Sequence, residues 1–63
     1  MISFIASLFN PAIDVDEIGF YTQAIGGYFE VHRGTQVEYF IPKEYRDFMI
    51  IKYPLLEEVA YVY

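Results

Sequence analysis

The segment from Gly26 to Pro42, GGYFEVHRGTQVEYFIP, constrains the fold more than any other part of the chain. It holds two runs rich in aromatic and β-branched residues, the side chains that favour strands. Gly34 and Thr35 separate the runs, and glycine accepts the positive φ that a tight turn requires. The sequence therefore predicts a β-hairpin over residues 28–41.

A third strand is expected directly before this hairpin. Residues 19–25, GFYTQAI, mix aromatic and β-branched residues with polar ones, and Gly26-Gly27 marks a turn after them. Together with the hairpin they form a predicted three-stranded meander over residues 18–41.

Two segments nearer the start of the chain give weaker patterns. Residues 12–18 alternate apolar and acidic side chains, which predicts an acidic strand or loop. The apolar residues 1–9 fit a helix almost as well as a strand, and we favour a strand or an irregular lead-in.

Pro42 begins a different pattern. Residues 42–51, PKEYRDFMII, place this proline in the first turn of a helix, where its missing N–H costs nothing. Glu44 lies near the positive end of that helix, which favours an acidic side chain. Pro54 disfavours helix at the residue before it, so we expect one short helix near residues 42–52. Its apolar face consists of Tyr45, Phe48 and Met49.

The end of the chain completes the predicted fold. In residues 58–63, EVAYVY, Val59, Tyr61 and Tyr63 alternate with Ala60 and Val62, which predicts a C-terminal strand. The predicted class is α+β: a small antiparallel β-meander of three to five strands with one short helix. An SH3-like curled β-barrel, with the helix as a short connector, is the alternative because it would contain the same meander.

The size of the chain limits how it can be stabilised. Its 63 residues have room for a single small domain, which buries only ~60% of the surface of its unfolded chain. Domains of this size usually need a disulfide, a metal or a partner chain. The sequence has no cysteine and one histidine, His32, so we expect no disulfide, metal or cofactor. The hydrophobic content of 56% therefore indicates an unusually rich core, association with another chain, or both.

Alternation divides the side chains of the predicted strands between two faces. The face expected to lie beneath the helix, against Phe48 and Met49, carries Phe20, Phe29, Val31, Val37, Tyr39 and Ile41. The opposite face carries Tyr21, Ile25, Tyr28 and Phe40, mixed with Glu30, His32 and Glu38. This second face is too apolar for a simple solvated surface. Either the chain ends cover it, or part of it is an exposed interface rich in tyrosine.

The second face supplies the candidate binding residues. An aromatic ring can pack against a partner while the tyrosine hydroxyl stays hydrogen-bonded. The predicted protein-binding residues are Tyr21, Tyr28, Glu30, Glu38 and Phe40, with Asp14, Asp16 and Glu17 as a second acidic group.

The charge of the chain restricts the class of partner. Nine acidic residues against four basic ones give a net charge of −5. Binding to nucleic-acid phosphates or to an anionic membrane depends on lysine and arginine, so neither is expected. A larger protein with a basic surface is the electrostatically favoured partner. The apolar opening segment spans nine residues, which is too short to cross a bilayer, and it lacks the basic start of a signal peptide; this predicts a cytoplasmic protein.

Catalysis and metal binding are not expected. A nucleophile needs a positioned base, but both serines, Ser3 and Ser7, lie in the apolar lead-in. His32 shares a strand face with Glu30, which is more typical of an exposed contact than of a catalytic pair. Residues 14–19 match the D-x-D-x-x-G start of a calcium loop, but isoleucines occupy its fifth and twelfth positions, where oxygen ligands are needed.

These features favour a small acidic protein-binding module: an adaptor, regulatory subunit or inhibitor that docks through a Tyr/Phe-rich sheet face with an acidic rim. One alternative is a nucleic-acid mimic whose carboxylates occupy the phosphate-binding groove of a DNA- or RNA-binding protein. In size and charge alone the chain is similar to small acidic phage-encoded inhibitors. A second alternative is a structural homo-oligomer, such as a homodimer, that buries its own aromatic face.

Overall fold

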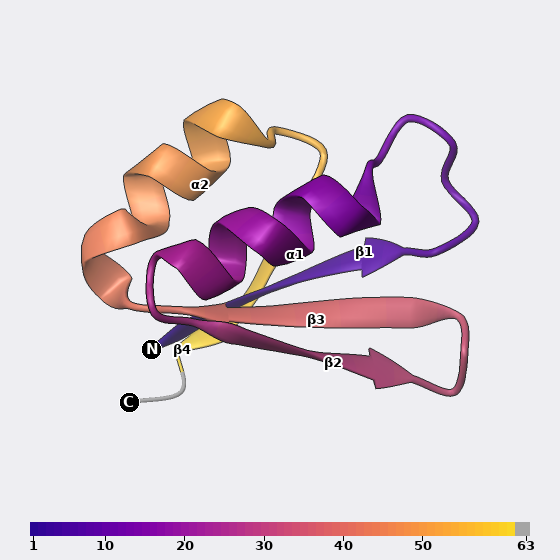
Figure 1. The fold of residues 1–63 in the computed structure, drawn as a ribbon, viewed down its shortest axis with the longest axis horizontal. Helices are drawn as coiled ribbons and strands as arrows, with labels where there is room; N and C mark the ends of the chain where they lie inside the picture. Colours follow the sequence, from indigo (N-terminus) through magenta and orange to yellow (C-terminus); the bar gives the residue numbers. More distant parts are fainter. Residues whose placement is uncertain (62–63) are drawn as a thin grey trace.

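The computed structural model describes residues 1–61, without the side chains of residues 60 and 61 (Figure 1). The elements are β1 (Ile2–Ser7), α1 (Val15–Ala24), β2 (Tyr28–His32), β3 (Gln36–Ile41), the short 3₁₀ helix η1 (Lys43–Tyr45), α2 (Arg46–Lys52) and β4 (Glu57–Tyr61). The last two residues of the predicted final strand, 62 and 63, lie outside the described residues.

The four strands form one open antiparallel sheet in the order β2-β3-β1-β4. α1 connects β1 to β2 across β3, and α2 connects β3 to β4 across β1 (Figure 1). This is the β-α-β-β-α-β, ferredoxin-like arrangement of two split β-α-β units. The predicted α+β class with an antiparallel sheet is confirmed. The SH3-like barrel alternative is wrong, because the sheet of the described residues does not close.

Both helices cover the same face of the sheet. Ile18 of α1 and Met49 of α2 belong to one buried cluster with strand residues that all point to that face. The strand residues of the cluster are Ile2, Phe4, Ala6, Val37, Tyr39 and Ile41. Among residues 1–61, no helix lies on the opposite face. The N-terminal segment does not fold over that face, since β1 lies inside the sheet between β3 and β4.

Residues 15–24 form α1, so the predicted first strand of the meander is wrong. The side chain of Asp14 accepts a hydrogen bond from the Glu17 N–H at 3.1 Å and caps the helix. Asp16 and Glu17 lie in the first turn, where the helix dipole favours negative charge. The buried residues Ile18 and Thr22 are four apart, which is helical spacing.

Gly26 and Gly27 end α1 and do not form the predicted hairpin turn. The Gly27 N–H donates to the Thr22 carbonyl at 2.8 Å, and the Gly26 N–H donates to the Gln23 carbonyl at 3.1 Å. This pair of bonds defines a Schellman motif, in which the positive φ of 91° at Gly26 suits glycine. A Cβ at Gly27 would overlap the carbonyl oxygen of Phe40, so the chain passes too close to β3 for any side chain there.

The prediction of an acidic strand or loop over residues 12–18 is wrong for residues 15–18, which belong to α1. The remaining predicted elements are confirmed. β1 shows that the lead-in is a strand, β2 and β3 form the predicted hairpin, and α2 and β4 follow in the expected order. The hairpin turn has positive φ at Arg33 (55°) and Gly34 (70°), closed by a bond from the Thr35 N–H to the His32 carbonyl. Positive φ at both central residues is typical of a type I′ turn, whose twist matches that of the strands.

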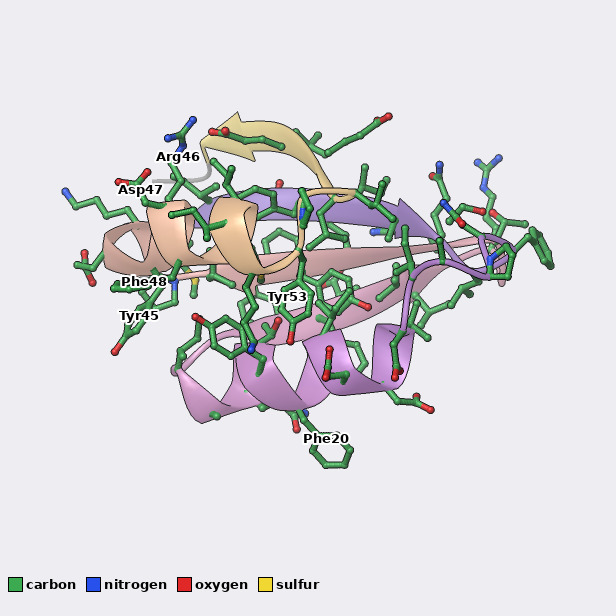
Figure 2. All side chains as sticks on the ribbon, turned by 90° about the horizontal axis from the view of Figure 1, so that it is seen from above. Phe20, Tyr45, Arg46, Asp47, Phe48 and Tyr53 are labelled. Carbon is green, nitrogen blue, oxygen red and sulfur yellow. The ribbon has the colours of Figure 1, made fainter. Side chains whose placement is uncertain are left out.

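Half of the predicted core is buried. Val37, Tyr39, Ile41 and Met49 lie in the core as expected. The prediction is wrong for Phe29 and Val31, which are 40% and 55% exposed because β2 is at the edge of the sheet. It is also wrong for Phe20 and Phe48, which are 76% and 61% exposed on α1 and α2 (Figure 2).

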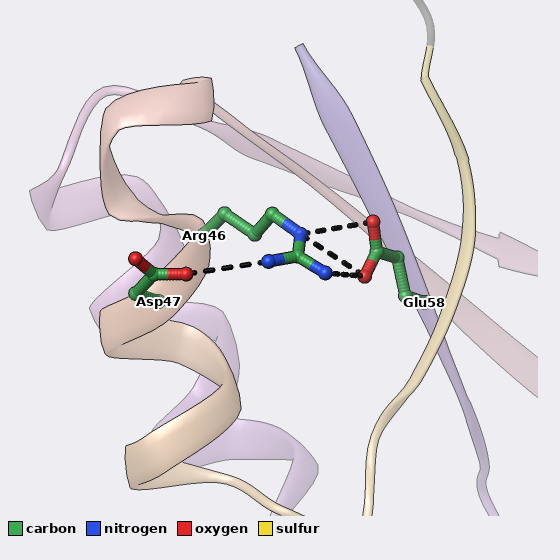
Figure 3. A network of polar contacts seen from close by, with 3 residues as sticks. All are labelled: Arg46, Asp47 and Glu58. Atoms are coloured by element: carbon green, nitrogen blue, oxygen red, sulfur yellow. Dashed lines mark hydrogen bonds and ion pairs between the residues drawn. The ribbon is translucent and has the colours of Figure 1, made fainter.

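One polar cluster joins α2 to the edge strand β4. The Arg46 guanidinium donates to both carboxylate oxygens of Glu58, with the shortest distance, 2.7 Å, from Nη2 to Oε1 (Figure 3). Arg46 also pairs with Asp47 at 3.3 Å. The hydrogen bond from Arg46 lowers the pKa of Glu58 below its usual value, and the same bond raises the pKa of Arg46. The pair is exposed, so its contribution to stability is small.

Candidate protein-binding surface

Strand β2 is exposed along most of its length. Tyr28, Phe29, Glu30 and Val31 are all exposed, and His32 is half-buried. Among the described residues, β2 pairs with β3 alone, so its other edge has no strand partner. We call the four exposed residues the β2 surface. They present an aromatic side chain to each face of the sheet.

On the helix-free face, Tyr28 stacks on Phe40 across the strand pair. The ring centroids are 4.6 Å apart and the ring planes differ by 16°. Phe40 is buried with 8% exposure, whereas Tyr28 is 46% exposed. The two predicted binding residues are therefore together, but only Tyr28 offers its ring to a partner. Phe40 supports the ring from beneath.

The predicted carboxylates Glu30 and Glu38 also meet on this face. They are directly opposite in the register of β2 and β3. Like charges at such positions are unfavourable. Glu38 is engaged by His32, whose Nε2 lies 2.9 Å from Oε1, and its side chain is only 20% exposed. Glu30 is exposed and has no ion-pair partner within the described part of the chain. The same row of the sheet ends at Glu57 on the opposite edge.

The remaining predicted residues lie on α1 and not on this face. Asp14 caps the helix, and Asp16 and Glu17 occupy its first turn, so their local roles explain their acidic character. Tyr21 packs edge-on against Tyr53 at 5.7 Å between ring centroids. Lys52 Nζ lies 5.7 Å from the centre of the Tyr21 ring. The fold therefore separates the predicted site into a sheet part and a helix part.

A groove between α1 and β2 was not predicted from the sequence. Its volume is about 280 Å³, and its exposed apolar walls are Phe20 from the helix and Phe29 and Val31 from the strand. Asp16 and Gln23 add polar atoms on the helix side. Asp16, Phe20 and Gln23 have helical spacing, which could have indicated this wall if residues 15–24 had been assigned to a helix.

Two features set the depth of this groove. Gly19 has no side chain, and a Cβ there would lie 3.2 Å from the Phe29 ring, so the glycine lets strand and helix approach closely. Tyr39 also lines the groove, although its side chain is fully buried. Its hydroxyl donates a hydrogen bond to the Val15 carbonyl at 3.1 Å. Burial, with the nearby charges of Asp16 and Asp14, raises the pKa of Tyr39 to about 12.

Comparison with protein-family models, curated proteins and solved structures finds no match.

The described residues also bear on two other classes of site. No three His, Cys, Asp or Glu side chains among them are placed to hold a metal ion. In the same part of the chain, no helix has the length and apolar character needed to cross a membrane.

Proposed function

We propose that this protein is a small acidic protein-binding module without catalytic activity, which docks on a larger cytoplasmic protein through the β2 surface. The observation that carries this proposal is the exposure of β2 along Tyr28–Val31, with an aromatic ring on each face and an edge that no strand of the described residues pairs with. Exposed apolar patches with a polar rim are typical of protein interfaces.

The charge distribution supports a basic partner. Glu30 lies on the β2 surface itself, and Asp16 borders the adjoining groove. The net charge of −5 adds a long-range attraction that speeds encounter with a positive surface. Binding of this kind is expected to weaken as salt screens the charges.

Selection from a library of displayed protein fragments tests this proposal. Fragments selected on the immobilised protein are measured against Tyr28→Ser and Glu30→Lys, with Glu57→Lys as the matched control. Glu57 is an exposed glutamate in the same row of the sheet, so its variant has the same charge change at the far edge. We expect roughly tenfold weaker binding for the first two variants. The control should change binding only through its altered net charge, which changes by the same amount in Glu30→Lys.

The proposal is wrong if the selected fragments bind all three variants alike, because the docking surface would then lie elsewhere. Each variant changes an exposed residue, so a loss of binding is separable from unfolding by circular dichroism.

A homo-oligomer is the second candidate, because the unpaired edge of β2 also permits pairing with another copy of the chain. Repulsion between two chains of net charge −5 makes it the weaker candidate. The nucleic-acid mimic gains no support from the placement of its carboxylates. Glu30, Glu38 and Glu57 belong to the sheet, whereas Asp14, Asp16 and Glu17 lie at the start of α1.

A further inference from the structure

We infer that the partner contributes an extended segment, which adds to the sheet as a fifth strand along β2. Its apolar side chains enter the groove between α1 and β2, and its basic side chains face Glu30. This inference rests on the proposed function and specifies the form and chemistry of the bound partner.

The backbone of β2 favours an extended partner. In an antiparallel pair, alternate residues direct both N–H and C=O toward the neighbouring strand, and the others direct them away. β3 satisfies one side of β2 in unbroken register from Tyr28 to His32. Within residues 1–61 no strand occupies the other side. The groups on that side are a template for another strand.

The two edges of the sheet differ in how they are protected. Natural edge strands are commonly blocked by proline, lysine, a bulge or a covering segment. The pairing of β4 with β1 contains a register shift between Ser3 and Phe4, and β4 begins with two consecutive glutamates. β2 has no proline, lysine or register shift. β2 is therefore the edge that is open to strand addition.

The groove is placed to receive alternate side chains of an added strand. Its walls include Phe29 and Val31, which point to the helix-covered side of β2, and Phe20 from α1. A strand beside β2 would direct every second side chain to that side. The absence of a side chain at Gly19 keeps this space open. Small β-branched side chains suit a shallow apolar groove next to a strand.

The opposite side of the added strand would meet different chemistry. Tyr28 and Glu30 lie on the helix-free face and are both exposed. A lysine or arginine there can pair with the Glu30 carboxylate and approach the face of the Tyr28 ring. A second copy of this chain is the poorer occupant, because it also carries a net charge of −5.

The test uses the blocked heptapeptide acetyl-KVKVKVK-amide and ¹⁵N-labelled protein. The expected result is saturable binding, with the largest amide shifts in β2 and new protection from hydrogen exchange on the outward amides of β2. A peptide of the same composition without alternation, acetyl-KKVVVKK-amide, is expected to bind roughly tenfold more weakly, since it cannot separate apolar and basic faces.

N-methylation distinguishes strand addition from simple charge attraction. One derivative is methylated on all valines and another on all lysines, so each blocks one of the two alternating sets of N–H groups. We expect methylation of the N–H groups that face β2 to weaken binding roughly tenfold or more, and methylation of the other set to leave binding nearly unchanged. Equal effects of the two derivatives, or no binding of the parent peptide, would overturn the inference.

A pair of phenylalanine variants tests the groove. Phe20 and Phe9 are 76% and 75% exposed, but only Phe20 lines the groove. We expect Phe20→Ser to weaken peptide binding several-fold and Phe9→Ser to leave it unchanged. Equal effects of these two variants would contradict the groove as the site.

The inference and the proposed function can fail separately. If the selected fragments depend on Tyr28 and Glu30 but the two methylated peptides bind the protein equally, the proposed function stands and strand addition is wrong. Fragments that bind Tyr28→Ser and Glu30→Lys as tightly as the unchanged protein would contradict the proposed function. A homodimer joined through β2 would replace the foreign strand with a second copy and overturn the inference.

Discussion

Tyr39 joins the sheet to α1 through one buried hydroxyl. Its side chain is fully buried, and its hydroxyl donates to the carbonyl of Val15 in the first turn of the helix. The ring also lies next to Phe29, at 6.0 Å between centroids, beneath the groove. Tyr39 therefore links the first turn of α1 to β3 and forms part of the lining of the groove.

Tyr39→Phe is expected to lower the free energy of unfolding by about 1 kcal/mol at neutral pH, the usual value of one hydrogen bond. The variant should also change the response to alkali. The pKa of Tyr39 is about 12 in the folded protein and near 10 in the unfolded chain. The raised folded-state pKa means that its contribution to stability is complete below pH 10 and is lost as the pH rises towards 12.

Urea unfolding between pH 8 and 11 measures this effect. The stability of the wild type should fall more steeply above pH 10 than that of Tyr39→Phe, because Tyr39 titrates only in the wild type. Parallel pH profiles for the two proteins would show that Tyr39 is not protected from ionisation by the fold.

At the scale of elements, the end of α1 determines where β2 begins. The Schellman motif at Gly26 and Gly27 turns the chain directly from the helix into the edge strand. Gly27 lies against the Phe40 carbonyl, whereas no atom lies within 4 Å of a Cβ built at Gly26. Glycine is thus required at the two adjacent positions for different physical reasons: the positive φ at Gly26 and the close approach to β3 at Gly27.

Alanine substitutions at the two glycines test these two reasons separately. Gly26→Ala should cost about 1 kcal/mol, the strain of a side chain at positive φ. Gly27→Ala should cost at least about 2 kcal/mol, because its Cβ overlaps backbone that cannot move without disturbing β3. Denaturant unfolding of both variants gives the comparison, and a smaller loss at Gly27 than at Gly26 would contradict the close approach.

At the scale of the whole molecule, the charge opposes association between copies of the chain. We expect light scattering to find a monomer over a wide range of dilution at low salt, because chains with a net charge of −5 repel each other when the charges are weakly screened. A stable dimer that Tyr28→Glu converts to a folded monomer would favour the homo-oligomer instead. Phe40→Glu is a poorer probe, since Phe40 is buried and its replacement would destabilise the monomer itself.

The sequence by itself determined the elements with strong local signals. Gly34 and the alternation on both sides of it determine the hairpin, and this alternation places Tyr28, Glu30, Glu38 and Phe40 on one face. Pro42 and Pro54 delimit the segment that contains α2. These features could be predicted because they depend on turn geometry and on the two-residue period of strands.

The tertiary structure decided the rest. Residues 15–24 contain apolar side chains compatible with either period. Asp14 and the two glycines are local helix signals, and the burial of Ile18 against the sheet decides between strand and helix. Strand order was equally hidden, since β1 pairs with β3 and β4 over long separations in the chain. That order places β2 at the edge, so Phe29 and Val31 are exposed beside α1 instead of buried beneath it. Local sequence does not encode which strand lacks a neighbour, and this one property creates the candidate binding surface.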